Sequence, residues 1–187
     1  MIRVNINIDE VIKPIVGKLT EIQQGEVGNN LLREVATTQL AEMKVRIFEQ
    51  GKDENDSTIG NYSTKPIYVN PNNSPKKFTT VGKTGKSKFS DGTPHKTRFF
   101  AQGYNGFKSE IGRNKIGTVN LSLSRDFQNK MTIIGTSNGW GIGWLEDEKY
   151  KRALHFQQKY KKQIFSQTKE EKEITQNVIN NYLKENI

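Results

Sequence analysis

The clearest hydrophobic pattern in the chain is a helical stripe over residues 29–50. Apolar side chains recur there at spacings of three and four residues, which places them on one face of an α-helix. Gly51 follows the last apolar position, and glycine is common where a helix ends. The pattern predicts a long helix that packs through Leu32, Val35, Ala36, Leu40, Met43, Ile47 and Phe48.

A second helical stripe lies at the end of the sequence. Thr168 and Glu171 have the spacing of a capping box, in which a hydroxyl and a carboxylate each accept a backbone N–H hydrogen bond at a helix start. We therefore predict a helix over 168–185, preceded by a helix over 147–159 and a short hinge. The apolar face of the last helix consists of Ile174, Val178, Ile179 and Tyr182.

Alternation of apolar and polar residues predicts strands elsewhere. It covers residues 2–8 and 118–123, and two further strands are expected over 131–135 and 141–144. The residues between this last pair, 137–139, end in Asn-Gly, a dipeptide favoured in tight hairpin turns. These strands predict a small antiparallel sheet.

Weaker helical patterns cover about 9–24 and 99–112. Together with the strands they predict an α+β fold, in which a small antiparallel sheet packs with a long N-terminal helix and with C-terminal helices. The length of the chain is that of one domain, so we expect a single domain over residues 1–187.

Residues 52–98 differ from the rest of the chain. They hold four of the five prolines and few large apolar residues, and only 67–69 and 78–81 have the character of short strands. A segment of this length without regular structure is uncommon inside a compact domain, so it is expected to be functional or mobile. We predict an extended polar and basic arm or loop.

Net charge is +9 and is concentrated in this arm. Residues 76–98, here called the basic segment, carry seven basic side chains against one acidic, and Phe78 and Phe89 lie among them. Interleaved cations and aromatic rings are typical of proteins that bind single-stranded nucleic acid, although a solvated loop has the same composition. The candidate contacts to DNA or to an acidic protein surface are Lys76, Lys77, Lys83, Lys86, Lys88, Lys96 and Arg98.

Two sequences resemble ligand-binding loops but lack required residues. Residues 81–87 contain Gly-Lys-Ser, but Thr80 occupies the position of the first glycine of a phosphate-binding loop. Residues beginning at Asp53 resemble a calcium loop, but Thr58 and Thr64 stand where glycine and the bidentate glutamate are needed. A lysine-rich loop and an ordinary turn are the expected structures.

Other chemistry is sparse. The chain has no cysteine, which excludes disulfides and thiolate metal sites, and its two histidines, His95 and His155, have no metal-ligand spacing. We expect no catalytic residue, no cofactor and no metal site. The start of the chain has no continuous apolar run, and no window approaches a membrane span, so a cytoplasmically made protein without membrane contact is expected.

Five apolar residues are candidates for contacts between subunits. Trp140 and Trp144 lie among glycines on the second strand of the expected hairpin, where they either pack in the core or form an edge for another subunit. Ile164 and Phe165 are large apolar groups in a polar hinge, and Val178 lies on the stripe of the last helix.

Three blocks of the sequence resemble the phage virion-morphogenesis family, the tail-completion or neck proteins of tailed phages. The first is the helix end at 44–51 with Asp53 and 59–63, the second is 121–131, and the third is 153–182. Members of the family tend to end with a helix carrying a His, a turn with Phe, a Ser/Thr-rich cap and an acidic amphipathic helix. The blocks occur here in the family's order and spacing.

The resemblance implies a structural virion protein at the head–tail junction, without catalysis. It implies a homo-oligomeric ring around the DNA channel that joins head to tail, in contact with neighbouring connector and tail proteins. The alternative is a non-enzymatic nucleic-acid-binding protein that acts through the basic segment. A small nuclease or toxin is disfavoured, since the sequence has no carboxylate–histidine constellation.

Overall fold

A computed structural model describes residues 26–70, 72, 74, 97–113, 117–136 and 139–186. Within these residues the fold is α+β, with small antiparallel sheets and long helices towards both ends, as the sequence predicts. The elements are α2 (Glu26–Lys44), the π-helix η1 (Val45–Gln50), β1 (Ile67–Val69), β2 (Arg98–Phe100), α3 (Gly103–Glu110), α4 (Asp126–Asn129), β3 (Thr132–Thr136), β4 (Gly139–Gly143), α5 (Asp147–Tyr160) and α6 (Lys169–Asn186).

The long helix predicted over 29–50 is confirmed, and it begins slightly earlier. Helix α2 continues directly into η1, whose wider π-helical turn buries three consecutive side chains, from Arg46 to Phe48. Gly51 ends the helix with a φ of 67°, a left-handed conformation that glycine adopts without the steric cost of a Cβ atom. The π-helical turn is thus the point at which a polar residue enters the core.

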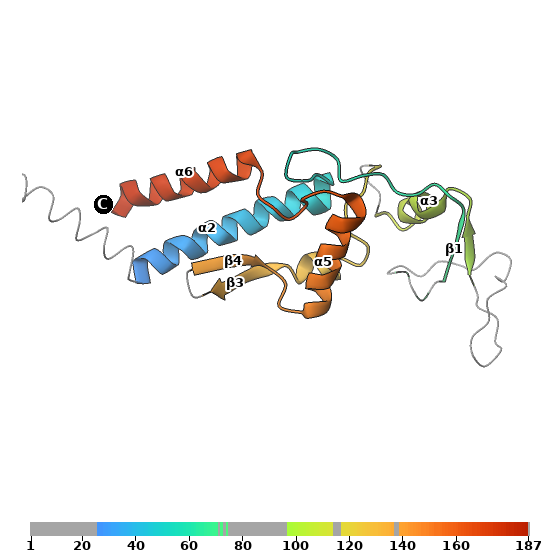
Figure 1. The fold of residues 1–187 in the computed structure, drawn as a ribbon, viewed down its shortest axis with the longest axis horizontal. Helices are drawn as coiled ribbons and strands as arrows, with labels where there is room; N and C mark the ends of the chain where they lie inside the picture. Colours follow the sequence, from blue (N-terminus) through green and yellow to red (C-terminus); the bar gives the residue numbers. More distant parts are fainter. Residues whose placement is uncertain are drawn as a thin grey trace, which may run out of the picture.

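Helix α2 is the middle layer of the molecule (Figure 1). Helix α6 runs along one side of it and the β3–β4 hairpin along the other, while α5 crosses near one end of the hairpin. Strands β3 and β4 pair antiparallel from Thr132–Gly143 to Thr136–Gly139, which confirms the predicted hairpin. The two helical stripes of the sequence therefore belong to neighbouring helices.

Aromatic rings fill the main core around Phe127 of α4. Its ring stacks on Trp144 with centroids 4.5 Å apart, and Phe48, Phe156 and Phe165 meet it edge-on at 5.6–6.1 Å. The indole Nε1 of Trp144 donates a hydrogen bond of 2.8 Å to the carbonyl oxygen of Phe127, so the buried ring has no unpaired donor. This cluster joins α4, α5, the hairpin and the hinge.

A smaller cluster lies towards one end of the molecule, where β1, β2 and α3 pack together (Figure 1). Its centre is an edge-on pair of Phe100 and Phe107, with centroids 5.4 Å apart. At Gly103, where φ is 60°, a Cβ atom would lie within 3 Å of the carbonyl oxygens of Ser63 and Lys65. Glycine thus allows the chain before β1 to lie directly against α3.

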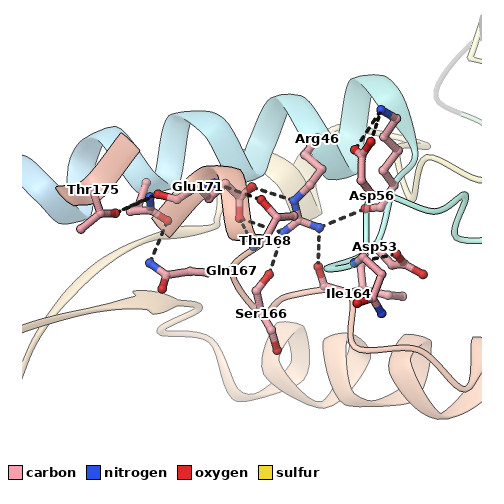
Figure 2. A network of polar contacts seen from close by, with 12 residues as sticks. Arg46, Asp53, Asp56, Ile164, Ser166, Gln167, Thr168, Glu171 and Thr175 are labelled. Carbon is pink, nitrogen blue, oxygen red and sulfur yellow. Dashed lines mark hydrogen bonds and ion pairs between the residues drawn. The ribbon is translucent and has the colours of Figure 1, made fainter. Parts of the chain in front are cut away.

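A buried ion pair joins η1 to the start of α6 (Figure 2). Arg46 Nε donates to Glu171 Oε1 at 2.6 Å, and both side chains are buried. The other guanidinium N–H groups donate to the carbonyl oxygens of Lys52, Ile164 and Ser166 at 2.8–3.1 Å. Arg46 therefore ties η1, the loop after it and the hinge residues Ile164 and Ser166 to one another.

The predicted capping box of α6 is confirmed and forms part of the same network. The Thr168 N–H donates to Glu171 Oε2 at 2.9 Å, and the Glu171 N–H donates to Thr168 Oγ1 at 3.0 Å. Gln39 of α2 donates to Thr175 Oγ1 at 2.6 Å and accepts from Gln167 at 2.8 Å. Figure 2 shows these residues gathered between the two helices.

One predicted strand is wrong. Residues 118–123 form only an isolated bridge, between Thr118 and Asn61. The Val119 N–H donates to Gly60, but Leu121 has a φ of 48°, which turns the backbone away from an extended ladder. In this loop the polar Asn120 and Ser122 are buried together with Val119, so the alternation does not separate a buried face from an exposed one. The expected elements at 2–8, 9–24 and 78–81 lie outside the described residues.

Candidate functional site

A pocket of about 440 Å³ lies at the junction of the two hydrophobic clusters. Tyr62 packs against the main core, and Tyr104 packs against the smaller cluster. We call it the tyrosine–cation pocket after the side chains that line it. Its aromatic and basic lining residues are Tyr62, Tyr104, Phe127, Phe156, Tyr160, Lys108, Arg125, Arg152 and Lys159.

Lys108 borders this pocket from α3 and is 1% exposed. Its ammonium donates to Asn120 Oδ1 at 3.3 Å and to the Ser122 carbonyl oxygen, and it lies 5.1 Å from the centre of the Tyr62 ring. These partners are neutral, so the buried charge has no counter-ion among them. Burial, and secondarily the charge of Arg113, lowers the pKa of Lys108 to about 8.

Three tyrosines form the wall beside this lysine. Tyr62 and Tyr104 have ring centroids 5.4 Å apart, and the Tyr160 ring lies over Gly60, where a Cβ atom would be 3.2 Å from it. The Tyr62 hydroxyl donates to Asn120 Oδ1 at 2.8 Å and accepts from the Asn120 N–H at 3.1 Å. Burial raises the pKa of all three tyrosines, so they stay neutral near pH 7.

The remaining cations of the pocket are exposed. Arg125 precedes α4 with a φ of 65°, while Arg152 and Lys159 come from α5. Arg152 pairs with Glu148 at 2.9 Å, and the Lys159 ammonium lies 5.5 Å from the centre of the Tyr160 ring. None of the described residues that line the pocket carries a carboxylate. Its electrostatics therefore favour an anionic ligand.

A second concave surface, the α2–β4 groove, has a volume of about 430 Å³. It lies between α2, β4 and the hinge, and Leu32, Trp140 and Phe165 line it. The Trp140 Nε1 donates to Asn29 Oδ1 at 2.9 Å, and the Arg33 guanidinium lies 5.7 Å from the ring centre. These contacts hold the indole between the strand and the helix.

The subunit-contact candidates are distributed over different environments. Trp144 and Ile164 are buried in the core of their own chain, which accounts for their apolar character without a second subunit. Trp140 and Phe165 are half-buried and share the α2–β4 groove, and Val178 is half-buried on α6. Phe165 meets the Trp144 ring edge-on at 5.1 Å, so it fills a pocket of its own chain.

Of the basic-segment candidates, only Arg98 lies among the described residues. It stands on β2 and pairs with Glu110 of α3. Beside it, the exposed rings of Tyr68 and Phe99 pack on one another with centroids 5.1 Å apart. Lys76, Lys77, Lys83, Lys86, Lys88 and Lys96, together with His95 and the phosphate-loop resemblance at 81–87, lie outside the described residues.

The calcium-loop resemblance folds as a turn, as expected. Asp53 accepts hydrogen bonds from the N–H groups of Asn55 and Ser57 at 3.0 Å, and pairs with Lys162 at 2.7 Å. Although burial acts in the opposite direction, these partners lower the pKa of Asp53. No group of three or more His, Cys, Asp or Glu side chains in the described part of the chain could hold a metal ion.

Sequence reasoning missed the tyrosine–cation pocket because its residues come from distant segments. One local signal was available. Tyr104, Phe107, Lys108 and Ile111 recur at helical spacing, so a lysine falls on the apolar face of the predicted helix over 99–112. A lysine in such a position is rarely fully buried without a role or a partner.

Comparison of the chain with protein-family models, with curated proteins and with solved structures found no match. Among the described residues, no helix is both long and apolar enough to cross a membrane.

Proposed function

We propose that this chain is a structural subunit of the phage neck or tail-completion region. It forms a homo-oligomeric ring around the DNA channel and joins head to tail, in contact with neighbouring connector and tail proteins. It acts in the virion after synthesis in the bacterial cytoplasm, and it has no enzymatic activity. The sequence resemblance suggests this role, and the α2–β4 groove is the observation that supports it best.

The groove supports a packing role because it combines exposed apolar surface with a sheet edge. Leu32 is 44% exposed beside the half-buried Trp140 and Phe165. In the described part of the chain, β3 pairs only with β4, so the hairpin has two outer edges at which another chain can add a strand. Aromatic side chains in such pockets commonly anchor protein interfaces.

Leu32→Glu should prevent assembly while leaving the monomer folded. A carboxylate in the groove would be desolvated without a partner if a neighbouring subunit covered it. Leu154→Glu is the matched control, because Leu154 is a similarly exposed helical leucine, at 40%, on α5 outside the groove. We expect particles to contain the wild-type and Leu154→Glu chains in multiple contacting copies, and to lack the Leu32→Glu chain.

Mass measurement and particle composition test this expectation, with circular dichroism to verify folding. Purified particles are the decisive sample, because a partner ring can template assembly. Absence of the wild-type chain from virions would rule the proposed function out. Full incorporation of the Leu32→Glu chain would rule out the groove as the interface.

A second function, nucleic-acid binding through the basic segment, is favoured by the β1–β2 pairing. Val69 pairs with Arg98, so the chain between them leaves and returns at adjacent positions. Arg98, the last residue of the basic segment, is therefore anchored at the small cluster, next to the exposed Tyr68–Phe99 ring pair. Exposed rings beside clustered cations suit contacts with bases and phosphates.

Changing Lys83, Lys86 and Lys88 to Ala should weaken DNA binding about equally for any sequence. Each lost phosphate contact should also flatten the dependence of log K on log salt by roughly 0.9 for duplex DNA. The control changes three exposed lysines of α6, Lys169, Lys172 and Lys184, which removes the same charge elsewhere. Titrations at several salt concentrations test this, and equal effects of both triple variants would contradict it.

A further inference from the structure

We propose that the tyrosine–cation pocket binds a nucleotide unit, with the base against the tyrosine rings and the phosphate among the cations. The unit is either a free nucleotide or part of a single strand, which share this chemistry. The site is separate from the α2–β4 groove, and its described lining residues include none from the basic segment. The proposal depends on neither of the two functions above.

The charge of the pocket is the first argument. Lys108, Arg125, Arg152 and Lys159 line it, and no carboxylate is among its described lining residues. Asp126, which follows Arg125 in the sequence, pairs with Lys149, whereas Glu148 pairs with the lining residue Arg152 at 2.9 Å. The Arg152–Glu148 pair is exposed on both sides and contributes little, so a phosphate can replace Glu148 at low cost.

Lys108 supplies a buried charge that pairs with no acidic side chain among the described residues. Its ammonium is buried against Asn120, Ser122 and the Tyr62 ring, which are neutral partners. A buried charge without a counter-ion is costly, and an anion entering the pocket would offset that cost. Removal of water from this region also strengthens the attraction between the ammonium and a bound phosphate.

The aromatic lining distinguishes a nucleotide from a simple anion or an acidic peptide. Tyr62, Tyr104, Phe156 and Tyr160 provide ring surface for a planar base, and base stacking on aromatic rings adds affinity for any base, because every base has a π-face. Asn61 and Ser124 add polar groups for the base edge or the sugar. A volume of about 440 Å³ lies in the range of small-ligand sites.

Calorimetric titration of the full chain with adenosine 5′-monophosphate, ribose 5-phosphate and inorganic phosphate tests the proposal. We expect the mononucleotide to bind at least about tenfold more tightly than the two base-free anions, the size of one stacking contribution.

A second titration asks whether the ligand is part of a strand. It uses a thymidine hexanucleotide and a Lys83→Ala, Lys86→Ala, Lys88→Ala background, which removes much of the basic segment's charge. If the hexanucleotide binds more tightly than the mononucleotide, the ligand of the pocket is part of a single strand. If it binds equally or more weakly, the ligand is a free nucleotide.

The site is located by a double variant, Arg152→Gln with Lys159→Gln, at two exposed positions of α5. It should lower mononucleotide affinity about tenfold or more without loss of folding. Lys151→Gln with Lys169→Gln removes the same charge outside the pocket, from side chains that are 73% and 92% exposed, and should leave affinity unchanged. Four results would overturn the proposal. They are equal binding of all three anions, tighter binding of a hexaglutamate peptide than of the mononucleotide, no binding, and equal effects of both double variants.

Discussion

Replacing Arg46 by methionine should lower the free energy of unfolding by about 3–5 kcal/mol, the usual cost of removing one partner from a buried ion pair. The substitution leaves the Glu171 carboxylate buried, where it retains only the Thr168 N–H as a donor among the contacts described. It also removes the donor to the Ile164 and Ser166 carbonyl oxygens. All of these hydrogen bonds are lost together because one guanidinium group donates them.

The loss should come from the buried network and not from the charge itself. Arg152→Met is the matched control, because Arg152 pairs with Glu148 on the exposed face of α5 and such pairs contribute about 0–1 kcal/mol. The double change Arg46→Met with Glu171→Leu should recover part of the loss, since it leaves no unpaired charge. Urea denaturation measures the free energy of unfolding of the wild-type chain and of these three variants. A loss below about 1 kcal/mol for Arg46→Met would show that the network does not hold α6.

The sequence predicts one half of this network and not the other. Thr168 and Glu171 are three residues apart, so their reciprocal hydrogen bonds follow from local spacing alone. Arg46 lies 125 residues from Glu171, and periodicity places it beside the apolar stripe as an ordinary surface residue. The π-helical turn of η1 brings it inside. Local patterns cannot predict such a change in helical register.

The same division applies to the candidate sites. The hairpin that carries Trp140 was predictable from alternation and from the Asn-Gly turn, so one wall of the α2–β4 groove was within reach of the sequence. The tyrosine–cation pocket was not, because Tyr62, Lys108 and Tyr160 are brought together only by packing between the two hydrophobic clusters. The loop that replaces the predicted strand at 118–123 supplies Asn120 and Ser122 to Lys108.

The second large effect concerns pH. Between about pH 7.5 and 9.5 the wild-type chain should gain about 2 kcal/mol of stability that a Lys108→Met chain does not gain. The pKa of Lys108 is about 8 in the folded protein and 10.5 in the unfolded chain. Between these values the unfolded state binds more protons, so stability rises with pH. Below pH 8 both states are protonated, and the cost of burying the charge is fully present.

The groups around Lys108 set the range in which this slope can be measured. Tyr62 and Tyr104 face it, and with Tyr160 they have raised pKa values, so they destabilise the fold only when tyrosines of the unfolded chain ionise near pH 10. The charge of Arg113 contributes to the lowered pKa of Lys108. Lys44 has a pKa lowered by burial and adds to the slope, but it is present in both chains and cancels in their difference.

Urea denaturation at half-unit pH intervals measures how stability changes with pH. It is applied to the wild-type, Lys108→Met and Lys151→Met chains. Lys151 is 73% exposed on α5, so its replacement should leave the wild-type slope intact. Methionine is an unbranched apolar side chain one atom shorter than lysine, and Asn120 Oδ1 still accepts from the Tyr62 hydroxyl, so the variant should fold. Parallel profiles for the wild-type and Lys108→Met chains would mean that the ammonium reaches water in the folded protein. The tyrosine–cation pocket would then lose its fixed, uncompensated charge and, with it, the main electrostatic reason to bind a phosphate.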